Sequence, residues 1–140
     1  MALACDLRIA SSKAKFGLTE VKVASLAGLN GTQMLPRVIP QAIAMKMLLT
    51  GETITAEEAL RYGLVSDVVP LPKLMERCEG LAVKIAAHAP LAVHHCLQAA
   101  TQGVGFAAES DLFGRCFSTQ DMREGVEAFL EKRKPSFKGS

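Results

Sequence analysis

The chain reads Phe16-Gly17-Leu18-Thr19-Glu20 and then Gly28-Leu29-Asn30-Gly31-Thr32-Gln33-Met34-Leu35-Pro36-Arg37 within its N-terminal third. The first stretch continues an alternation of apolar and polar residues, which is typical of a β-strand. In the second, the glycines and Asn30 adopt positive φ angles at low cost, which predicts a loop. A short helix then opens at Thr32, and the prolines at 36 and 40 restrict or end it. The chain therefore changes here from extended segments to helices.

Short extended segments lie on both sides of this point. Residues 7–10 and 14–18 alternate in strand fashion, with the turn-like cluster Ser11-Ser12-Lys13 between them. Residues 21–23 alternate again, and residues 64–69 predict a further strand before Pro70.

The rest of the chain has helical patterns. Thr55-x-x-Glu58 is a capping box that starts a helix ending at Gly63. Apolar spacing and Pro or Gly boundaries predict further helices over residues 41–49, 72–88, 90–102, 106–117 and 120–134, the last with a cap at Ser118 and an end at Pro135. A few strands followed by about six helices predict an α/β chain of the α+β type.

Composition excludes several classes of protein. The 140 residues are 49% hydrophobic and 21% charged, which fits one domain or a piece of one and excludes intrinsic disorder and fibrous repeats. Aromatic residues make up 5% of the chain and the net charge is +2, so no nucleic-acid partner is expected.

Cysteine and histidine spacing predicts no metal site. The cysteines at 5, 78, 96 and 116 form no Cys-x-x-Cys pair, and no carboxylate lies at ligand spacing from His88, His94 or His95. We expect four buried thiols with no histidine partner for nucleophilic catalysis. The chain shows neither a signal peptide nor a membrane span, which predicts a cytoplasmic protein, or a mitochondrial-matrix one if it is eukaryotic.

Five stretches together resemble the crotonase superfamily, specifically its enoyl-CoA hydratase-like members. They comprise residues 2–10, 14–20 and 28–37, Leu49-Thr50-Gly51-Glu52 with Ala56-Glu57-Glu58-Ala59 and Gly63-Leu64-Val65, and the ending at residues 123–135. The resemblance implies a partial crotonase (ClpP-like) fold. Residues 1–70 would form the C-terminal part of its β/α spiral core, and residues 71–140 a helical region for trimerisation and CoA contact.

The same resemblance implies that the chain corresponds to the C-terminal half of such a protein. In the family, two backbone N–H groups bind the thioester oxygen. One comes from the first half, and the other from a Gly-Gly-Gly-x-Glu stretch directly before the segment that matches residues 2–10. A single such donor is worth roughly 2.7–4 kcal/mol, so we expect the isolated 140-residue chain to be inactive.

The resemblance also implies the site residues. Glu20 matches an acid/base glutamate, Ala27, Gly28 and Leu29 match the wall of the acyl pocket, and Phe129 and Lys132 match contacts to the adenine and phosphates of CoA. The alternatives are a solvated loop carboxylate at Glu20, a core residue at Phe129 and a solvated basic helix end at Lys132. The chain departs from the family pattern, with Ala24-Ser25 for Gly-Leu, Ala27 for Pro, Asn30 for Gly and Met34 for Arg.

Two functional hypotheses follow from the resemblance. The first is part of an enoyl-CoA hydratase, with an isomerase of the same superfamily as its variant; acyl-CoA is the substrate and no cofactor is required. The second is a non-catalytic oligomerisation or CoA-binding module. Both predict a homo-oligomer, which in the family is a trimer or a dimer of trimers, with no nucleic-acid or membrane partner.

Overall fold

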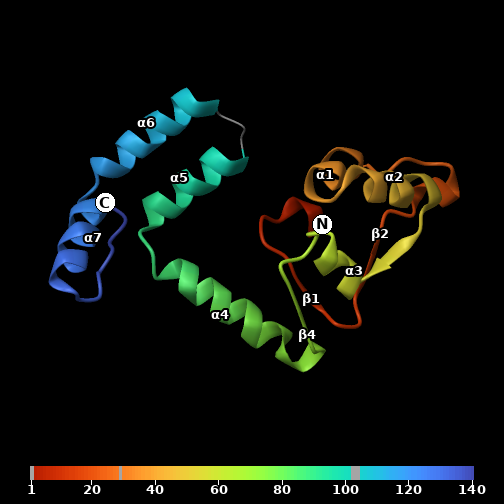
Figure 1. Ribbon diagram of the computed structural model, residues 1–140, viewed down its shortest axis with the longest axis horizontal. Coiled ribbons are helices and arrows are strands. Elements are labelled where there is room, and N and C mark those ends of the chain that lie inside the picture. Colours follow the sequence, from red (N-terminus) through yellow and green to blue (C-terminus); the bar gives the residue numbers. More distant parts are fainter. Residues whose placement is uncertain (1, 29, 102–104) are drawn as a thin grey trace. The chain divides into compact units, whose positions relative to one another are not determined.

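A computed structural model describes residues 2–28, 30–101 and 105–140, and these residues contain two small sheets and seven α-helices (Figure 1). The chain divides into two compact units, Met1–Cys78 and Glu79–Ser140. This mixed architecture confirms the predicted fold class. Within the described ranges, no helix has the length and hydropathy needed to cross a membrane.

The first unit contains two sheets of two strands each. Strand β1 (Ile9–Ser11) runs parallel to β4 (Asp67–Val69), and β2 (Lys15–Gly17) pairs antiparallel with β3 (Thr53–Thr55). Three of these strands fall inside predicted extended segments or overlap them. Strand β3 was not predicted, because its few residues acquire strand geometry only by pairing with β2.

The extended prediction for residues 21–23 is wrong. Glu20–Val23 forms a 3₁₀-helix, η2, that is closed by Ala24 in the left-handed conformation, with φ 56°. The Ala24 N–H group donates to the carbonyl oxygens of Glu20 and Val21. Val21 and Val23 are exposed, so no sheet face buries the alternation that suggested a strand.

Helices pack with these strands in the first unit. They are η1 (Ala2–Ala4), α1 (Gly31–Val38), α2 (Gln41–Thr50), α3 (Ala56–Arg61) and η3 (Leu71–Lys73). Helix α1 continues through Pro36 instead of ending there. It ends before Ile39, which is extended at φ −125°, as expected for a residue that precedes a proline.

The core of the first unit is aliphatic. Leu35 of α1 is 2% exposed and Met47 of α2 is also 2% exposed. The other core members come from the strands, from α2 and α3, and from the turns: Ala10, Ile39, Ala44, Ile54, Ala56, Ala59, Leu64 and Val65. The predicted capping box is confirmed, since Glu58 N donates to Thr55 Oγ1 at 3.2 Å and Thr55 N donates to Glu58 Oε2 at 2.8 Å.

The second unit is helical. Helix α4 (Leu74–Ala86) leads into it, and α5 (Pro90–Thr101), α6 (Gly105–Phe117) and α7 (Gln120–Glu131) follow. Helix α7 is capped by Thr119, whose hydroxyl accepts a hydrogen bond from Met122 N, and not by Ser118 as predicted. It ends at Glu131 instead of 134, because Lys132 turns left-handed before Pro135 is reached.

The C-terminal residues fold back along α7. The buried Asp121 carboxylate accepts hydrogen bonds from the amides of Lys138 and Gly139, each at 2.7 Å. Glu124 accepts two bonds from the Arg133 guanidinium, at 2.6 and 2.9 Å, and one from the Ser136 amide. These bonds lower the pKa of Glu124 to about 2, with the Arg133 bonds as the largest cause.

Candidate functional site

Glu20 opens η2, between strand β2 and helix α1. Its backbone is firmly fixed, because its carbonyl oxygen accepts hydrogen bonds from the N–H groups of Ala24 and Ser25. Glu20 is partly exposed, whereas a solvated loop carboxylate would be fully exposed.

One carboxylate oxygen of Glu20 is an unsatisfied acceptor. Oε2 is buried and receives no hydrogen bond from the described residues. A buried polar atom without a partner costs about 1–3 kcal/mol, and such an atom in a native fold needs an explanation. A donor supplied by water or by a ligand would satisfy this oxygen.

The loop after Glu20 is built by close backbone packing. Ala27 is 5% exposed, and the N–H of Gly31 donates to the carbonyl of Gly28 at 3.0 Å. A Cβ atom on Gly31 would lie 3.0 Å from Ala27 Cβ and 3.3 Å from Leu18 Cδ1, so this position favours glycine. Gly28 is exposed, with open space where a Cβ would stand. Leu29, which was predicted to line the acyl pocket, lies outside the described residues.

The residues other than glycine that adopt the left-handed conformation lie in or next to the predicted site segments. In the described chain they are Ala24 (φ 56°), Asn30 (φ 67°) and Lys132 (φ 55°). Ala24 follows η2, Asn30 precedes α1, and Lys132 is the predicted CoA contact. Such conformations cost about 1–2 kcal/mol for ordinary residues and concentrate at functional sites. The backbone conformation at Ala24 would therefore favour glycine, which is the family residue that Ala24 replaces.

Phe129 and Lys132 lie in the second unit, at the end of α7. Phe129 is 82% exposed, so it is not the core residue of the alternative interpretation. Lys132 is the left-handed cap, and Arg133 N donates to Ala128 O at 3.0 Å in a Schellman arrangement. Phe129 lies in the last turn of α7, whereas Lys132 lies beyond its last helical residue, Glu131. Both residues belong to the second unit, whereas Glu20 belongs to the first.

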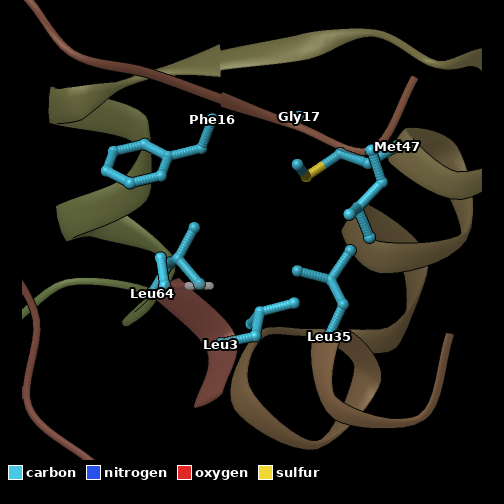
Figure 2. Close-up of a pocket in the computed structure, with 8 residues that line it drawn as sticks. Leu3, Phe16, Gly17, Leu35, Met47 and Leu64 are labelled. Atoms are coloured by element: carbon cyan, nitrogen blue, oxygen red, sulfur yellow. The ribbon is translucent and has the colours of Figure 1, made fainter. Parts of the chain in front are cut away.

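A small apolar cavity of about 130 Å³ lies in the first unit (Figure 2). Figure 2 shows Leu3, Phe16, Leu35, Met47 and Leu64 directed toward it from several elements. Ala2, Gly17 and Leu18 complete the lining. The sequence predictions missed this cavity, because its walls come from η1, β2, α1, α2 and the segment after α3. No lining residue is titratable, so the cavity offers space for hydrocarbon and no acid/base group.

The cysteine predictions need correction. Cys5 and Cys96 are exposed, while Cys78 and Cys116 are half-buried. Cys116 does have a histidine partner, since Nδ1 of His95 lies 3.3 Å from its Sγ. The residues are 21 positions apart, so only the packing of α5 against α6 reveals the pair. The described residues contain no cluster of His, Cys, Asp and Glu that could hold a metal ion.

The geometry favours acid/base chemistry at a single carboxylate. Glu20 is held by its backbone, keeps one oxygen out of bulk water and leaves that oxygen open to a donor. A carboxylate in this state can accept a proton from water and return it to a neighbouring carbon.

The chain is similar to known proteins over its whole length. A profile of the enoyl-CoA hydratase/isomerase family matches residues 1–140. An (E)-benzylidenesuccinyl-CoA hydratase from Thauera aromatica is 60% identical, over 100% of this chain and 57% of that protein. A 2,3-dehydroadipyl-CoA hydratase from Escherichia coli is 43% identical, over 99% of this chain and 57% of that protein.

Solved structures give the same result. An enoyl-CoA hydratase from Bacillus anthracis superposes with a TM-score of 0.90 at 41% identity, covering 99% of this chain and 56% of that one. The chain thus spans a little over half the length of these relatives.

Proposed function

Because the chain belongs to the enoyl-CoA hydratase/isomerase family, we propose that it forms the catalytic-glutamate portion of an enoyl-CoA hydratase. The enzyme would add water across the 2,3-double bond of a 2-enoyl-CoA and give a 3-hydroxyacyl-CoA. We propose further that this portion is the C-terminal half, and that both N–H donors for the thioester oxygen come from the preceding half. The reaction needs no metal or cofactor.

The open oxygen of Glu20 is the observation that carries this proposal. Oε2 is buried and accepts no hydrogen bond in the described chain, so it is poised to hold a water molecule. In the forward direction the water oxygen forms a bond to the β-carbon, and the carbon–carbon π bond breaks toward the α-carbon. Glu20 accepts the proton that the water releases, and the α-carbon gains a proton. The isomerase variant would use the same carboxylate to move a proton between carbons, and the two differ in whether water is held.

Phe129 and Lys132 support a CoA-contacting role for the end of α7. An 82% exposed phenyl ring offers a flat apolar face for adenine, and the neighbouring ammonium offers a charge for phosphate. Ala27, Gly28 and Leu29 would line the acyl pocket. We propose a homo-oligomer, a trimer or a dimer of trimers. The alternative role as an oligomerisation module is favoured by one observation, the exposed apolar residues Val126, Phe129 and Leu130 of α7.

The acyl group is proposed from the 60% identical relative, whose name specifies (E)-benzylidenesuccinyl-CoA. The departures at Ala27 and Asn30 fall in the loop that would line the acyl pocket, and Met34 lies in α1, which follows this loop. We propose that the complete enzyme prefers this aryl-substituted thioester to the short crotonyl-CoA. Comparing kcat/KM for the two thioesters tests the preference, and a higher value for crotonyl-CoA would contradict it.

The test of catalysis uses a reconstituted enzyme. Here this means the chain co-expressed with the segment of the Thauera aromatica relative that it does not cover. We expect hydration by the reconstituted enzyme and none near enzymatic rates by the 140-residue chain alone. Glu20→Gln should lower kcat by about 10²–10⁴-fold, the usual worth of a general acid/base.

Glu57→Gln is the matched control. Glu57 is an exposed glutamate in the first turn of α3, and its substitution should leave kcat within about twofold of the parent, because surface substitutions change little. Equal activity of the Glu20→Gln and Glu57→Gln enzymes would refute the assignment of Glu20. Full activity of the isolated chain would refute the need for a second half.

A further inference from the structure

A cysteine and a histidine, neither of them assigned a role above, lie close together in the second unit. Nδ1 of His95, on α5, lies 3.3 Å from Sγ of Cys116, on α6. This distance is within hydrogen-bonding range for sulfur, and the pair has the nucleophile-and-base arrangement of activated thiols. We propose that Cys116 is a nucleophilic thiol, activated by His95, that adds covalently to α,β-unsaturated carbonyl compounds.

The position of Cys116 explains why its thiol would need a base. It lies in the last turn of α6, where its own carbonyl oxygen accepts bonds from the amide and the hydroxyl of Thr119, at 3.1 and 2.7 Å. These bonds fix the backbone beneath the sulfur. The C-terminal end of a helix disfavours an anion, so a free thiolate gains nothing from this helix. The proton must therefore leave to His95 as the sulfur attacks.

His95 is placed to take that proton. With its proton on Nε2, the ring presents the Nδ1 lone pair to the thiol hydrogen. Both residues are half-buried, which keeps the pair partly out of water. The exposed ring of Phe113, three residues before Cys116 on α6, adds an apolar surface one helical turn away. Soft electrophiles with an apolar body fit this surface better than hydrophilic oxidants do.

The reaction is a balanced addition. The Sγ lone pair forms a bond to the β-carbon, the carbon–carbon π bond breaks toward the α-carbon, and the thiol proton passes to Nδ1 of His95. The resulting enolate takes a proton at the α-carbon, and His95 returns to its neutral form. One S–H unit has then been added across one double bond, and no oxidant or further reactant is consumed.

N-ethylmaleimide is the probe, because its double bond lies between two carbonyl groups. The labelling rate of each cysteine in the whole chain is measured at neutral pH by peptide mass spectrometry. Cys78 is the matched reference, since it is also half-buried and forms no hydrogen bond with a histidine in the described chain. Cys96 is the exposed reference. We expect Cys116 to react faster than both.

Variants assign the effect to the histidine. Because the proton leaves as the sulfur attacks, His95 acts as a general base, whose help is typically worth about 10²–10⁴-fold. We expect His95→Gln to slow the labelling of Cys116 by about tenfold or more, and His94→Gln, at the exposed neighbouring histidine, to leave it unchanged. Circular dichroism of each variant verifies that the helices remain folded.

Two results would overturn the proposal. One is a labelling order in the unmodified chain that follows exposure, with Cys96 faster than Cys116. The other is a folded His95→Gln chain whose Cys116 reacts at the unmodified rate. Neither measurement involves hydratase activity, so a negative result would not bear on the role assigned to Glu20.

Discussion

Different interactions stabilise the interior of each of the two units. Thirteen apolar residues are buried in the described chain, and Leu112 and Ala128 are the two of them that lie in the second unit. The first unit encloses an aliphatic core around Leu35 and Met47. The second unit relies on hydrogen bonds to Asp121 and Glu124 that attach the C-terminal residues to α7.

The first unit has an aliphatic core of its own, although apolar residues such as Val23, Leu26 and Leu49 are exposed there. Helix α7 exposes Val126, Phe129 and Leu130, which follow the spacing of one helical face. An apolar face of this kind is normally covered, so we expect the second unit to gain stability from a further copy or from the rest of the protein.

The largest expected effect is a difference between two leucines. Leu35→Ala should lower the free energy of unfolding by about 2–5 kcal/mol, because it opens a cavity in a core. Leu130→Ala should change it by less than about 0.5 kcal/mol, since that side chain is 73% exposed. Urea unfolding followed by circular dichroism measures both at low protein concentration. Equal losses in the two variants would show that the face of α7 is already covered.

The next effect tests the polar support of the second unit. Asp121→Ala removes the acceptor for two backbone N–H groups and should cost about 2–3 kcal/mol. Asp111→Ala, which removes an exposed i,i+4 ion pair with Arg115, should cost less than about 0.5 kcal/mol and is the control. Amide hydrogen exchange at residues 138 and 139 reports the release directly. Unchanged protection there would contradict the role assigned to Asp121.

A smaller effect depends on pH. The pKa of Glu124 is lowered from 4.5 to about 2 in the folded chain, so its contribution is complete above about pH 4.5 and is lost as the pH falls toward 2. The protection factor of the Ser136 amide, which compares its exchange rate with the intrinsic rate at the same pH, should therefore fall across this interval. In Glu124→Gln the protection factor should already be lower at neutral pH and should change less on acidification. Glu127→Gln, at an exposed residue of the same helix, should behave as the parent.

The smallest effect concerns the left-handed cap. Lys132→Gly should stabilise the second unit by about 1 kcal/mol, because glycine adopts positive φ without the steric cost. Lys132→Ala keeps that cost and removes the charge, so it should leave stability nearly unchanged. If the ammonium binds CoA phosphate, both variants should bind CoA more weakly in the reconstituted enzyme. Unchanged CoA affinity in both variants would show that Lys132 does not bind the CoA phosphate.

Local signals explain what the sequence could predict. The capping box at Thr55 and the end of α2 depend on neighbouring residues alone. The capping box formed as predicted, and α2, which was predicted over residues 41–49, ends one residue later, before the left-handed Gly51. The strand predicted at residues 21–23 failed because alternation means a strand only where a partner buries one face. The burial of Asp121 and the His95–Cys116 contact depend on segments far apart in the chain, which no local pattern encodes.

The candidate site shows the same division. Glu20 was identified through a resemblance between sequence motifs, whereas the unsatisfied state of its Oε2 atom is a property of the folded chain. The replacement of a family glycine by Ala24 was visible in the sequence. Only the structure shows that this residue is left-handed, directly after the helix that holds Glu20.

A crystal structure of the reconstituted enzyme with a bound enoyl-CoA would show whether Glu20 holds the reacting water. We predict a water molecule within about 3 Å of Glu20 Oε2, hydrogen-bonded to it and facing the β-carbon of the thioester. A side chain or an amide of the added segment bonded to Oε2, with the thioester bound away from it, would contradict the role assigned to Glu20.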